Sequence, residues 1–410
     1  MTDVARRRVL FLGLGHLSNG DVSIAADFAR QLPTDGFEVG FVTSAATAAH
    51  VRGTGLTTYP LSSQDPRRNL ADFDALVAGF RPELLVAADA FTLDYSTAWS
   101  GLSMGLLRER YEAALASFDQ YDYPAADYLV DFYGGHRTRF PRLLDACDLL
   151  IRNSPLNRPA PAEPGVITTR MLCGGSAPLP VGPRRSQPPT VFLTNSRWEY
   201  VNVVRSPGMA QLMRAMPRII HSHLAALDRP LRVVHVGPSP WDFPPAPRIG
   251  YRHVPRLDPA DFHAQLSAAD LYLTGNAVSV TLTQAVLAGV PSLLLDNHKV
   301  LDLAKLAAAG SAPGWLLDAA PGLETAYPYR VFPWGWHDFL TPVLTGNPYA
   351  DCFRTAGLFE RRGVLRAMTE LLDDAGARAR LAERQADLLH HLDGLPAAGD
   401  ALHGAKLPGW

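Results

Sequence analysis

Two kinds of hydrophobic pattern alternate along the first part of the chain. Short stretches that are apolar throughout predict buried strands, and the segments between them carry apolar residues at helical spacing. The predicted strands are 9–15, 37–44, 56–61, 83–89, 127–132 and 148–154. Strands that are apolar on both faces and separated by helices are typical of a parallel sheet covered on each side. Right-handed crossovers would make such a sheet doubly wound.

A second series of the same kind begins near residue 190. It predicts four strands, a long helix around 209–227, a shorter helix at 280–289 and further helices to about 394. The strands of this series are 190–196, 231–237, 271–276 and 291–297. Between the two series, residues 155–189 are rich in proline and glycine, apart from a short strand-like stretch at 166–172, and are typical of a linker.

The two series predict an α/β protein of two doubly wound, Rossmann-like domains. The first domain covers 1–183 and includes the linker from about 155, and the second covers 184–385. The remaining segment, 386–410, is expected to form a C-terminal helix or tail that can pack back on the first domain. Because the carboxyl ends of parallel strands line a crevice, two such domains facing across a cleft would offer a site for a small ligand.

Composition narrows the class of protein. Of the 410 residues 47% are hydrophobic and 19% are charged, which predicts an ample core. The 38 basic and 40 acidic residues leave a net charge of −2, so we expect no nucleic-acid partner. Three widely spaced cysteines form neither a metal motif nor a disulfide framework, which suits the cytoplasm. The apolar runs are strand-sized, so membrane insertion is not expected.

Small polar residues follow two predicted strands within the stretch ADLYLTGNAVSVTLTQAVLAGVPSLLLDN, residues 269–297. Ser279 is the predicted N-cap of the helix between them, and the first N–H groups of a helix have no intrahelical partner and favour a phosphate. Thr281 and Gln284 share a face of that helix. Asp296 and Asn297 leave the second strand, where a carboxylate and an amide suit hydroxyl groups. Alternatively, Ser279 is only a helix cap and Asn297 only a turn residue.

This stretch resembles the donor-binding segment of GT-B glycosyltransferases, among them the natural-product and MurG-like transferases. The resemblance implies that Ser279 and Thr281 face the diphosphate of a nucleotide sugar, that Gln284 contacts the ribose, and that Asp296 with Asn297 contacts the sugar. Three departures point to an unusual donor or to altered phosphate contacts. The family's His-Gly-Gly is replaced by residues 276–278, which begin with Asn276, its ribose acid by Gln284, and the Gln of its Asp-Gln pair by Asn297.

Other strand exits of the second series fit the same resemblance. Asn195 and Arg197 follow the strand at 190–196, where the family approaches the diphosphate and Arg197 could supply a forked cationic contact. A surface ion pair is the alternative for Arg197. Gly237 would lie at the nucleotide, and the backbone around Val254 would contact the base.

In the first series the resemblance implies that His16, in the loop after the first strand, is the general base for an acceptor hydroxyl. The alternative is a loop histidine without a catalytic role. Asp89, at the end of the strand at 83–89, is a candidate to orient His16 or the acceptor, and Asp131 is a second one. The spacing of the loop glycines 13, 15 and 20 is not that of a dinucleotide-binding loop.

The resemblance implies metal-independent transfer of a sugar from a UDP- or dTDP-sugar to a small-molecule acceptor, as in the specialised metabolism that produces antibiotics. No Asp-x-Asp lies at the predicted diphosphate site, and no tightly bound cofactor is expected. Two alternatives stay open: a non-hydrolysing nucleotide-sugar epimerase of the same fold, and a catalytically silent GT-B-like partner protein. We expect a monomer or a homodimer.

Overall fold

The computed structural model describes residues 6–15, 19–122, 129–132, 136–159, 163–171, 187–197, 207–326 and 340–407. Of these, residues 129–132, 136–141 and 207–209 are described by their backbone alone. The chain divides into two compact units. Unit 1 comprises Met1–Ser176, Pro342–Asn347 and Leu389–Trp410, and unit 2 comprises Ala177–Thr341 and Pro348–Leu388.

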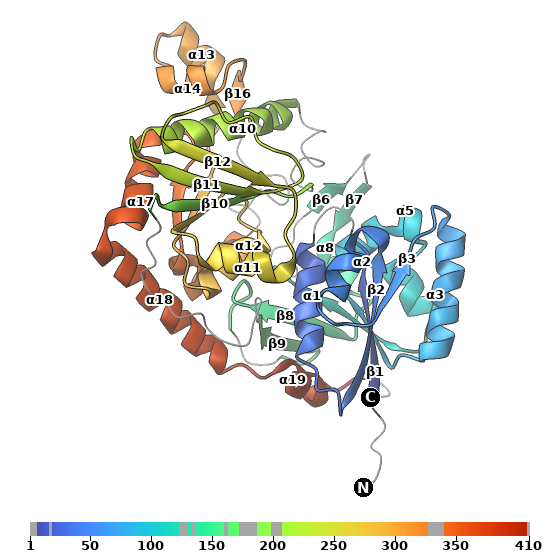
Figure 1. Cartoon of the computed structure of the whole chain (residues 1–410). Coiled ribbons are helices and arrows are strands. Elements are labelled where there is room, and N and C mark those ends of the chain that lie inside the picture. The colour runs from blue at the N-terminus through green and yellow to red at the C-terminus, as the bar shows by residue number, and fades with distance from the viewer. Residues whose placement is uncertain are drawn as a thin grey trace. The chain divides into compact units, whose positions relative to one another are not determined.

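A seven-stranded sheet forms the centre of unit 1. Its strand order is β3-β2-β1-β4-β5-β8-β9, and all neighbours are parallel (Figure 1). The strands are β1 (Arg7–Gly13), β2 (Phe37–Ser44), β3 (Thr58–Leu61), β4 (Leu84–Ala87), β5 (Ala114–Phe118), β8 (Leu149–Ser154) and β9 (Val166–Arg170). A separate antiparallel pair consists of β6 (Leu129–Phe132) and β7 (His136–Arg139).

Helices cover both faces of this sheet, because successive side chains of a strand point to opposite sides. Phe11 of β1 packs against Phe28 of the first helix, with ring centroids 6.2 Å apart. Its neighbour Leu10 lies on the other face, where Leu10 and Phe80 of the third helix both flank Gly40. The helices are α1 (Gly20–Arg30), α2 (Ala45–Arg52), α3 (Pro66–Phe80), α4 (Ala90–Tyr95), α5 (Thr97–Ser100), α6 (Met104–Arg110) and α8 (Phe140–Leu144).

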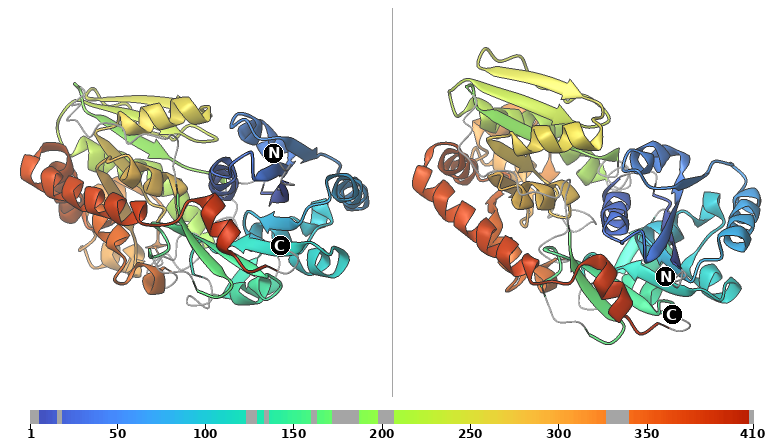
Figure 2. Two further views of the ribbon diagram at one scale, coloured as in Figure 1. Left: turned by 90° about the horizontal axis from the view of Figure 1, so that it is seen from below. Right: turned by 60° about the horizontal axis from the view of Figure 1, so that its bottom comes forward.

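Segments from the end of the chain complete unit 1. Helix α19 (Ala398–Gly404) lies against β9 (Figure 2). The His403 ring is 4.8 Å from that of Phe37, and a side chain at Gly399 would come within 2.7 Å of Pro33. Asn347 donates its side-chain N–H groups to the carbonyls of Pro155 and Leu156, at 3.0 and 2.8 Å. Unit 1 therefore combines segments that are far apart in the sequence.

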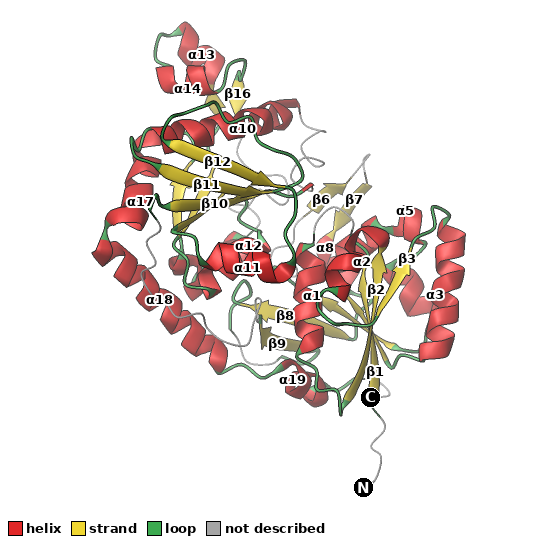
Figure 3. Ribbon diagram, viewed as in Figure 1, coloured by secondary structure: helices red, strands yellow, loops and turns green. Residues whose placement is uncertain are grey.

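Unit 2 is built on a six-stranded sheet, again with parallel neighbours throughout, in the order β12-β11-β10-β13-β14-β17 (Figure 3). The strands are β10 (Thr190–Thr194), β11 (Leu231–Val236), β12 (Ile249–Val254), β13 (Leu271–Thr274), β14 (Ser292–Asp296) and β17 (Arg354–Gly357). The helices are α10 (Pro207–Ala225), α11 (Pro259–Ser267), α12 (Val280–Leu287), α16 (Thr341–Leu344), the 3-10 helix η2 (Pro348–Cys352), α17 (Arg361–Asp373) and α18 (Ala375–Asp393), of which α16 and α18 run into unit 1.

The two faces of the second sheet bury different helices. Alternate strand residues such as Leu193 and Leu273 join a core with side chains of α10 and α17. Phe192, which points to the opposite face, makes an edge-to-face contact with Phe262 of α11 at 5.6 Å. Helix α12 buries its apolar side next to α11. This confirms the predicted fold class of two doubly wound α/β sheets.

An excursion follows β14 and projects from unit 2 (Figure 1). It contains α13 (Leu303–Ala308), α14 (Gly314–Ala319) and the short antiparallel strands β15 (Leu301–Asp302) and β16 (Thr325–Ala326). Leu303 and Leu316 belong to the core of unit 2, so the excursion is anchored there. Among the helices that the structure describes, none combines the length and the hydropathy that a membrane crossing needs.

The strands differ from the prediction where the pattern is weak. Strand β5 lies between β4 and β8 but was not predicted, because three of its five residues are alanine or serine. The predicted strand at 127–132 forms β6, which belongs to the antiparallel pair and not to the main sheet. The strand-like stretch within the expected linker is β9, at the edge of the first sheet.

Candidate functional site

The carboxyl ends of the strands of unit 2 bring the predicted donor-binding residues to one edge of the sheet. Strands β11, β10, β13 and β14 are neighbours in that order, so the residues that follow them are close in space. The residues at this edge are Asn195 and Arg197 after β10, Gly237 after β11, Val254 at the end of β12, Asn276, Ser279, Thr281 and Gln284 after β13, and Asp296 and Asn297 at the end of β14.

The turn between β13 and α12 is held by its own polar groups. Thr274 Oγ1 accepts a hydrogen bond from the Asn276 N–H at 3.0 Å, and Asn276 Oδ1 accepts one from the Val278 N–H at 3.0 Å. Asn276 is buried, and both contacts fix the path of the backbone into the helix. In this sequence an amide therefore shapes the turn where the resembled family has His-Gly-Gly.

Ser279 occupies the N-cap position of α12, as predicted, but its side chain makes no capping hydrogen bond. Its hydroxyl oxygen lies 3.4 Å from the Tyr272 hydroxyl, which is 2.8 Å from Thr194 Oγ1. Three hydroxyl groups thus line up from the end of β10 to the start of α12. The first N–H groups of the helix, at Val280 and Thr281, have no carbonyl within the helix to bind.

Helix α12 carries the next candidates on its exposed side. Thr281 and Gln284 are half-buried, whereas Leu282 and Ala285 are buried against the sheet. The helix ends at Leu287, and Gly289 follows its C-cap with a φ of +70°, which suits glycine. The Val290 N–H then closes the turn on the Ala285 carbonyl at 2.8 Å.

The exit of β14 is a buried polar turn. Asp296 lies 3.2 Å, through Oδ1, from His298 Nδ1, and Asn297 Oδ1 accepts a hydrogen bond from the Lys299 N–H at 3.3 Å. Lys299 in turn pairs with Glu360 at 2.9 Å. This hydrogen bond from Asn297 is typical of a turn residue. The alternative that Asn297 is only a turn residue therefore explains this contact.

A buried chain of hydrogen bonds runs beneath the exit of β10. His235, which is 0% exposed, places Nε2 2.5 Å from Asn195 Oδ1 and Nδ1 2.7 Å from the Tyr251 hydroxyl. Burial and the nearby His253 lower the pKa of His235 to about 4, so its ring is neutral. Sequence analysis did not select His235 or Tyr251. The sequence feature that could have identified His235 is a histidine between valines, at the end of the strand, where every residue is apolar except His235.

The backbones of Gly237 and Val254 extend this chain of hydrogen bonds. The Gly237 N–H donates to the Val254 carbonyl at 3.1 Å, and the Gly237 carbonyl lies 2.8 Å from His253 Nε2. A side chain at position 237 would meet Asn195 Oδ1 at 1.7 Å. Arg197 is exposed and forms no ion pair with any residue that the structure describes.

The carboxyl edge of the first sheet carries acids. Asp89 follows β4, is buried, and accepts a hydrogen bond from the Thr92 N–H at 2.7 Å as the N-cap of α4. Asp21, in the first turn of α1, is also buried, and its Oδ2 has no hydrogen-bond partner among the described residues. Burial and the charge of Asp89 raise the pKa of Asp21 to about 7. Sequence analysis did not select Asp21.

His16 and Asp131 were predicted for the same site as Asp89. His16 lies outside the described residues, and Asp131 lies in β6, where the backbone alone is described. A third acid of the edge, Asp119 after β5, is fully buried and pairs with Arg152 Nε at 3.1 Å.

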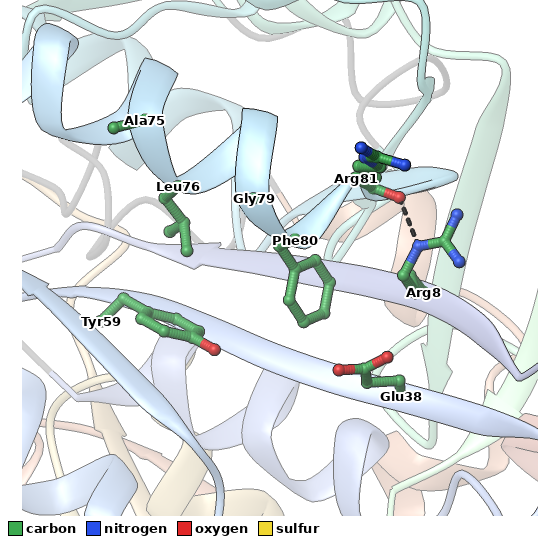
Figure 4. A pocket seen from close by; sticks show the side chains of 8 residues that line it. All are labelled: Arg8, Glu38, Tyr59, Ala75, Leu76, Gly79, Phe80 and Arg81. Atoms are coloured by element: carbon green, nitrogen blue, oxygen red, sulfur yellow. Dashed lines mark hydrogen bonds between the residues drawn. The ribbon is translucent and has the colours of Figure 1, made fainter.

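A groove of about 580 Å³ lies at the opposite end of the first sheet, between α3 and the amino ends of β1 to β3 (Figure 4). There Arg8 donates to the Arg81 carbonyl at 2.6 Å and pairs with Glu83 at 3.1 Å. The groove is remote from the strand exits, and we do not assign it to the candidate site. Across the described residues, no cluster of histidine, cysteine or acidic side chains could hold a metal ion.

Comparisons with known proteins agree with this architecture. A family model described as "Family of unknown function (DUF6365)" matches residues 28–406. The chain matches none of the curated proteins. Among solved structures it is similar to the spinosyn forosaminyltransferase SpnP, with 16% identity, a TM-score of 0.56, and coverage of 97% of this chain and 98% of that one.

Two further solved structures are similar over a comparable length. The spinosyn rhamnosyltransferase SpnG complexed with thymidine diphosphate has 15% identity, a TM-score of 0.52, and coverage of 97% and 99%. A putative UDP-N-acetylglucosamine 2-epimerase from Listeria monocytogenes has 12% identity, a TM-score of 0.55, and coverage of 98% and 94%. At such identities the likeness establishes the fold, and it confirms the resemblance to the GT-B architecture.

Proposed function

For this chain, which belongs to the family of unknown function DUF6365 and has the GT-B fold, we propose the transfer of a sugar from a nucleoside diphosphate donor to a small-molecule acceptor. The observation that carries the proposal is the carboxyl edge of unit 2. There, amides, hydroxyls and the start of α12 gather at the ends of adjacent strands. Neutral donors and helix N–H groups suit the charge of a departing diphosphate.

In this proposal each predicted residue has a role at the donor. Ser279, Thr281 and the first N–H groups of α12 hold the diphosphate, Gln284 contacts the ribose, and Asp296 with Asn297 contacts the sugar. Asn195, Asn276 and Arg197 lie on the phosphate side, and Gly237 with Val254 lies at the nucleoside. The donor is a dTDP- or UDP-sugar; the bound thymidine diphosphate of SpnG supports the first choice.

The chemistry requires a base and no metal. The acceptor nucleophile attacks the anomeric carbon, the bond from that carbon to the phosphate oxygen breaks, and the diphosphate leaves with the electron pair. His16 takes the proton from the acceptor, and Asp89 orients the imidazole or the acceptor. Exclusion of water from the bound donor would prevent its hydrolysis.

The first experiment measures binding of dTDP, UDP, GDP and ADP by calorimetry and thermal shift, because a ligand that binds only the folded state raises the melting temperature. We expect one or two of the four to bind, and the Ser279→Ala/Thr281→Val double variant to lose at least tenfold in affinity. A matched control, Ser311→Ala/Thr325→Val in the excursion, makes the same chemical changes away from the strand exits. If the wild type binds none of the four, the proposal is wrong.

The second experiment separates the reaction classes. Incubation of the bound nucleotide sugar without acceptor, followed by NMR, detects a new epimer only if the protein is an epimerase. Turnover with an acceptor library that His16→Ala abolishes would identify His16 as the base. Nucleotide binding without turnover in either assay would favour a silent partner protein.

A further inference from the structure

The contacts around His235 determine where its proton lies. His235 Nε2 faces Asn195 Oδ1, an oxygen that can only accept, so the ring accepts at Nδ1. There the Tyr251 hydroxyl lies 2.7 Å away, and its oxygen also accepts from the Trp241 backbone N–H at 2.8 Å. A neutral imidazole that accepts at Nδ1 carries its proton on Nε2. That Nε2–H then points at Asn195 Oδ1, 2.5 Å away.

Steric packing keeps the Asn195 amide against the histidine. The absence of a side chain at Gly237 leaves room for Asn195 Oδ1, and a methyl group there would also come within 3.0 Å of His235 Nε2. The Asn195 backbone is fixed as well, because its N–H donates to the Val236 carbonyl at 3.2 Å. The pairing of strands β10 and β11 thus fixes both the backbone and the side-chain amide of Asn195.

We propose that His235 is a positioning residue for Asn195: by holding the amide oxygen, it turns the amide NH₂ toward the phosphates of a nucleotide at the exit of β10. This inference rests on the proposed function, and it adds that the anion is recognised by a neutral amide whose orientation is fixed from within the sheet. The opposite orientation would bring the amide NH₂ against the Nε2–H and leave both donors without an acceptor.

The test compares affinity for dTDP, or for whichever nucleoside diphosphate binds best, in four variants: His235→Ala, Asn195→Ala, the double variant His235→Ala/Asn195→Ala, and His235→Gln. We expect each alanine variant to bind about tenfold more weakly, and the double variant to bind no more weakly than Asn195→Ala alone, because both changes remove one contact. Glutamine can donate to Asn195 and accept from Tyr251, so His235→Gln should bind within about threefold of the wild type.

His223→Ala is the matched control for general damage to unit 2. His223 is also fully buried, but it lies in α10 and binds the carbonyl of Leu358 at 2.8 Å. Leu358 follows β17, which β13 and β14 separate from β10 and Asn195. We expect His223→Ala to lower the melting temperature and to leave the affinity unchanged. If it weakens binding as much as His235→Ala does, or if the two alanine effects multiply in the double variant, the inference is wrong.

A second measurement does not depend on the alanine variants folding. The ¹⁵N NMR spectrum of the wild type should show His235 as the neutral Nε2–H tautomer at pH 7, and the Nδ1–H tautomer would overturn the inference. Failure of the wild type to bind any nucleoside diphosphate overturns the proposed function and this inference together. Binding by the wild type with unchanged affinity in His235→Ala overturns the inference alone.

Discussion

The carboxyl edges of the two sheets both follow parallel strands, but their side chains differ in chemistry. In unit 1 the strand exits carry the buried acids Asp21, Asp89 and Asp119. In unit 2 the exits of β10 and β13 carry amides and hydroxyls, such as Asn195 and Ser279, with a neutral histidine beneath them. A buried acid of unit 2, Asp296, lies at the end of β14, apart from these two exits. Both edges arise from parallel strands followed by helices, so the backbone does not distinguish them.

Side-chain chemistry, and not the fold, therefore decides which ligand each edge suits. A diphosphate placed next to buried carboxylates would be repelled, whereas amide and hydroxyl donors offset its charge. An acid with a raised pKa, such as Asp21, suits proton transfer or the orientation of hydroxyl groups. The comparison therefore supports the donor at unit 2 and the acceptor at unit 1 within the proposed function.

The largest expected effect is the pH dependence that Asp21 gives to unit 1. Its pKa in the folded protein, about 7, exceeds the ordinary value of 3.8, so the folded state binds the proton more tightly. Its contribution to stability is complete below pH 3.8 and is lost as the pH rises through 7, by about 4 kcal/mol. Chemical denaturation of Asp21→Asn and wild type from pH 4 to 8 should show this slope in the wild type and not in the variant. Equal slopes would contradict the raised pKa.

His235 should give unit 2 the opposite slope. Its pKa falls from 6.5 to about 4 on folding, because burial disfavours the charged ring. The unfolded chain therefore binds the proton more tightly, and stability is lost as the pH falls from 6.5 to 4, by about 3 kcal/mol. Comparison of His235→Gln with the wild type over this range isolates the effect from that of His223, whose pKa is also lowered to about 4.

The third prediction exchanges the chemistry of the two edges. Asn195→Asp keeps an oxygen for the His235 Nε2–H but places a negative charge beside the proposed diphosphate. We expect a loss of about 100-fold in nucleotide affinity, which is about 2.7 kcal/mol. The reverse change in unit 1, Asp89→Asn, should leave nucleotide affinity unchanged. A similar loss in both variants, measured by calorimetry, would remove the distinction between the edges.

The smallest expected effect concerns Gly237. A methyl group there would collide with Asn195 Oδ1, so Gly237→Ala should push the amide away from His235 and lower stability by about 2 kcal/mol. The control is Gly314→Ala in the excursion, where nothing lies within 4 Å of the added carbon. Unchanged stability in Gly237→Ala, measured by denaturation, would show that the Asn195 side chain has room to move.

Much of the fold could be predicted from local patterns, because burial on both faces leaves a continuous apolar run. Strand β2 has the predicted bounds, and the segment from β13 through α12 to β14 contains the predicted N-cap at Ser279 and the glycine end at Gly289. Strand β5 escaped prediction, since alanine and serine give a weak pattern even at a central position in the sheet. Local patterns thus identify elements where the side chains are large.

The two α/β series and the polar residues at the strand exits can be recognised in the sequence, because both depend on neighbours along the chain. The tertiary structure alone decided which exits meet. Asn195 and His235 are 40 positions apart and touch only because β10 and β11 pair in register. Asp89 raises the pKa of Asp21 only because β1 and β4 are neighbours. Such contacts follow from strand order, which is a property of the whole sheet and cannot be inferred from a local pattern.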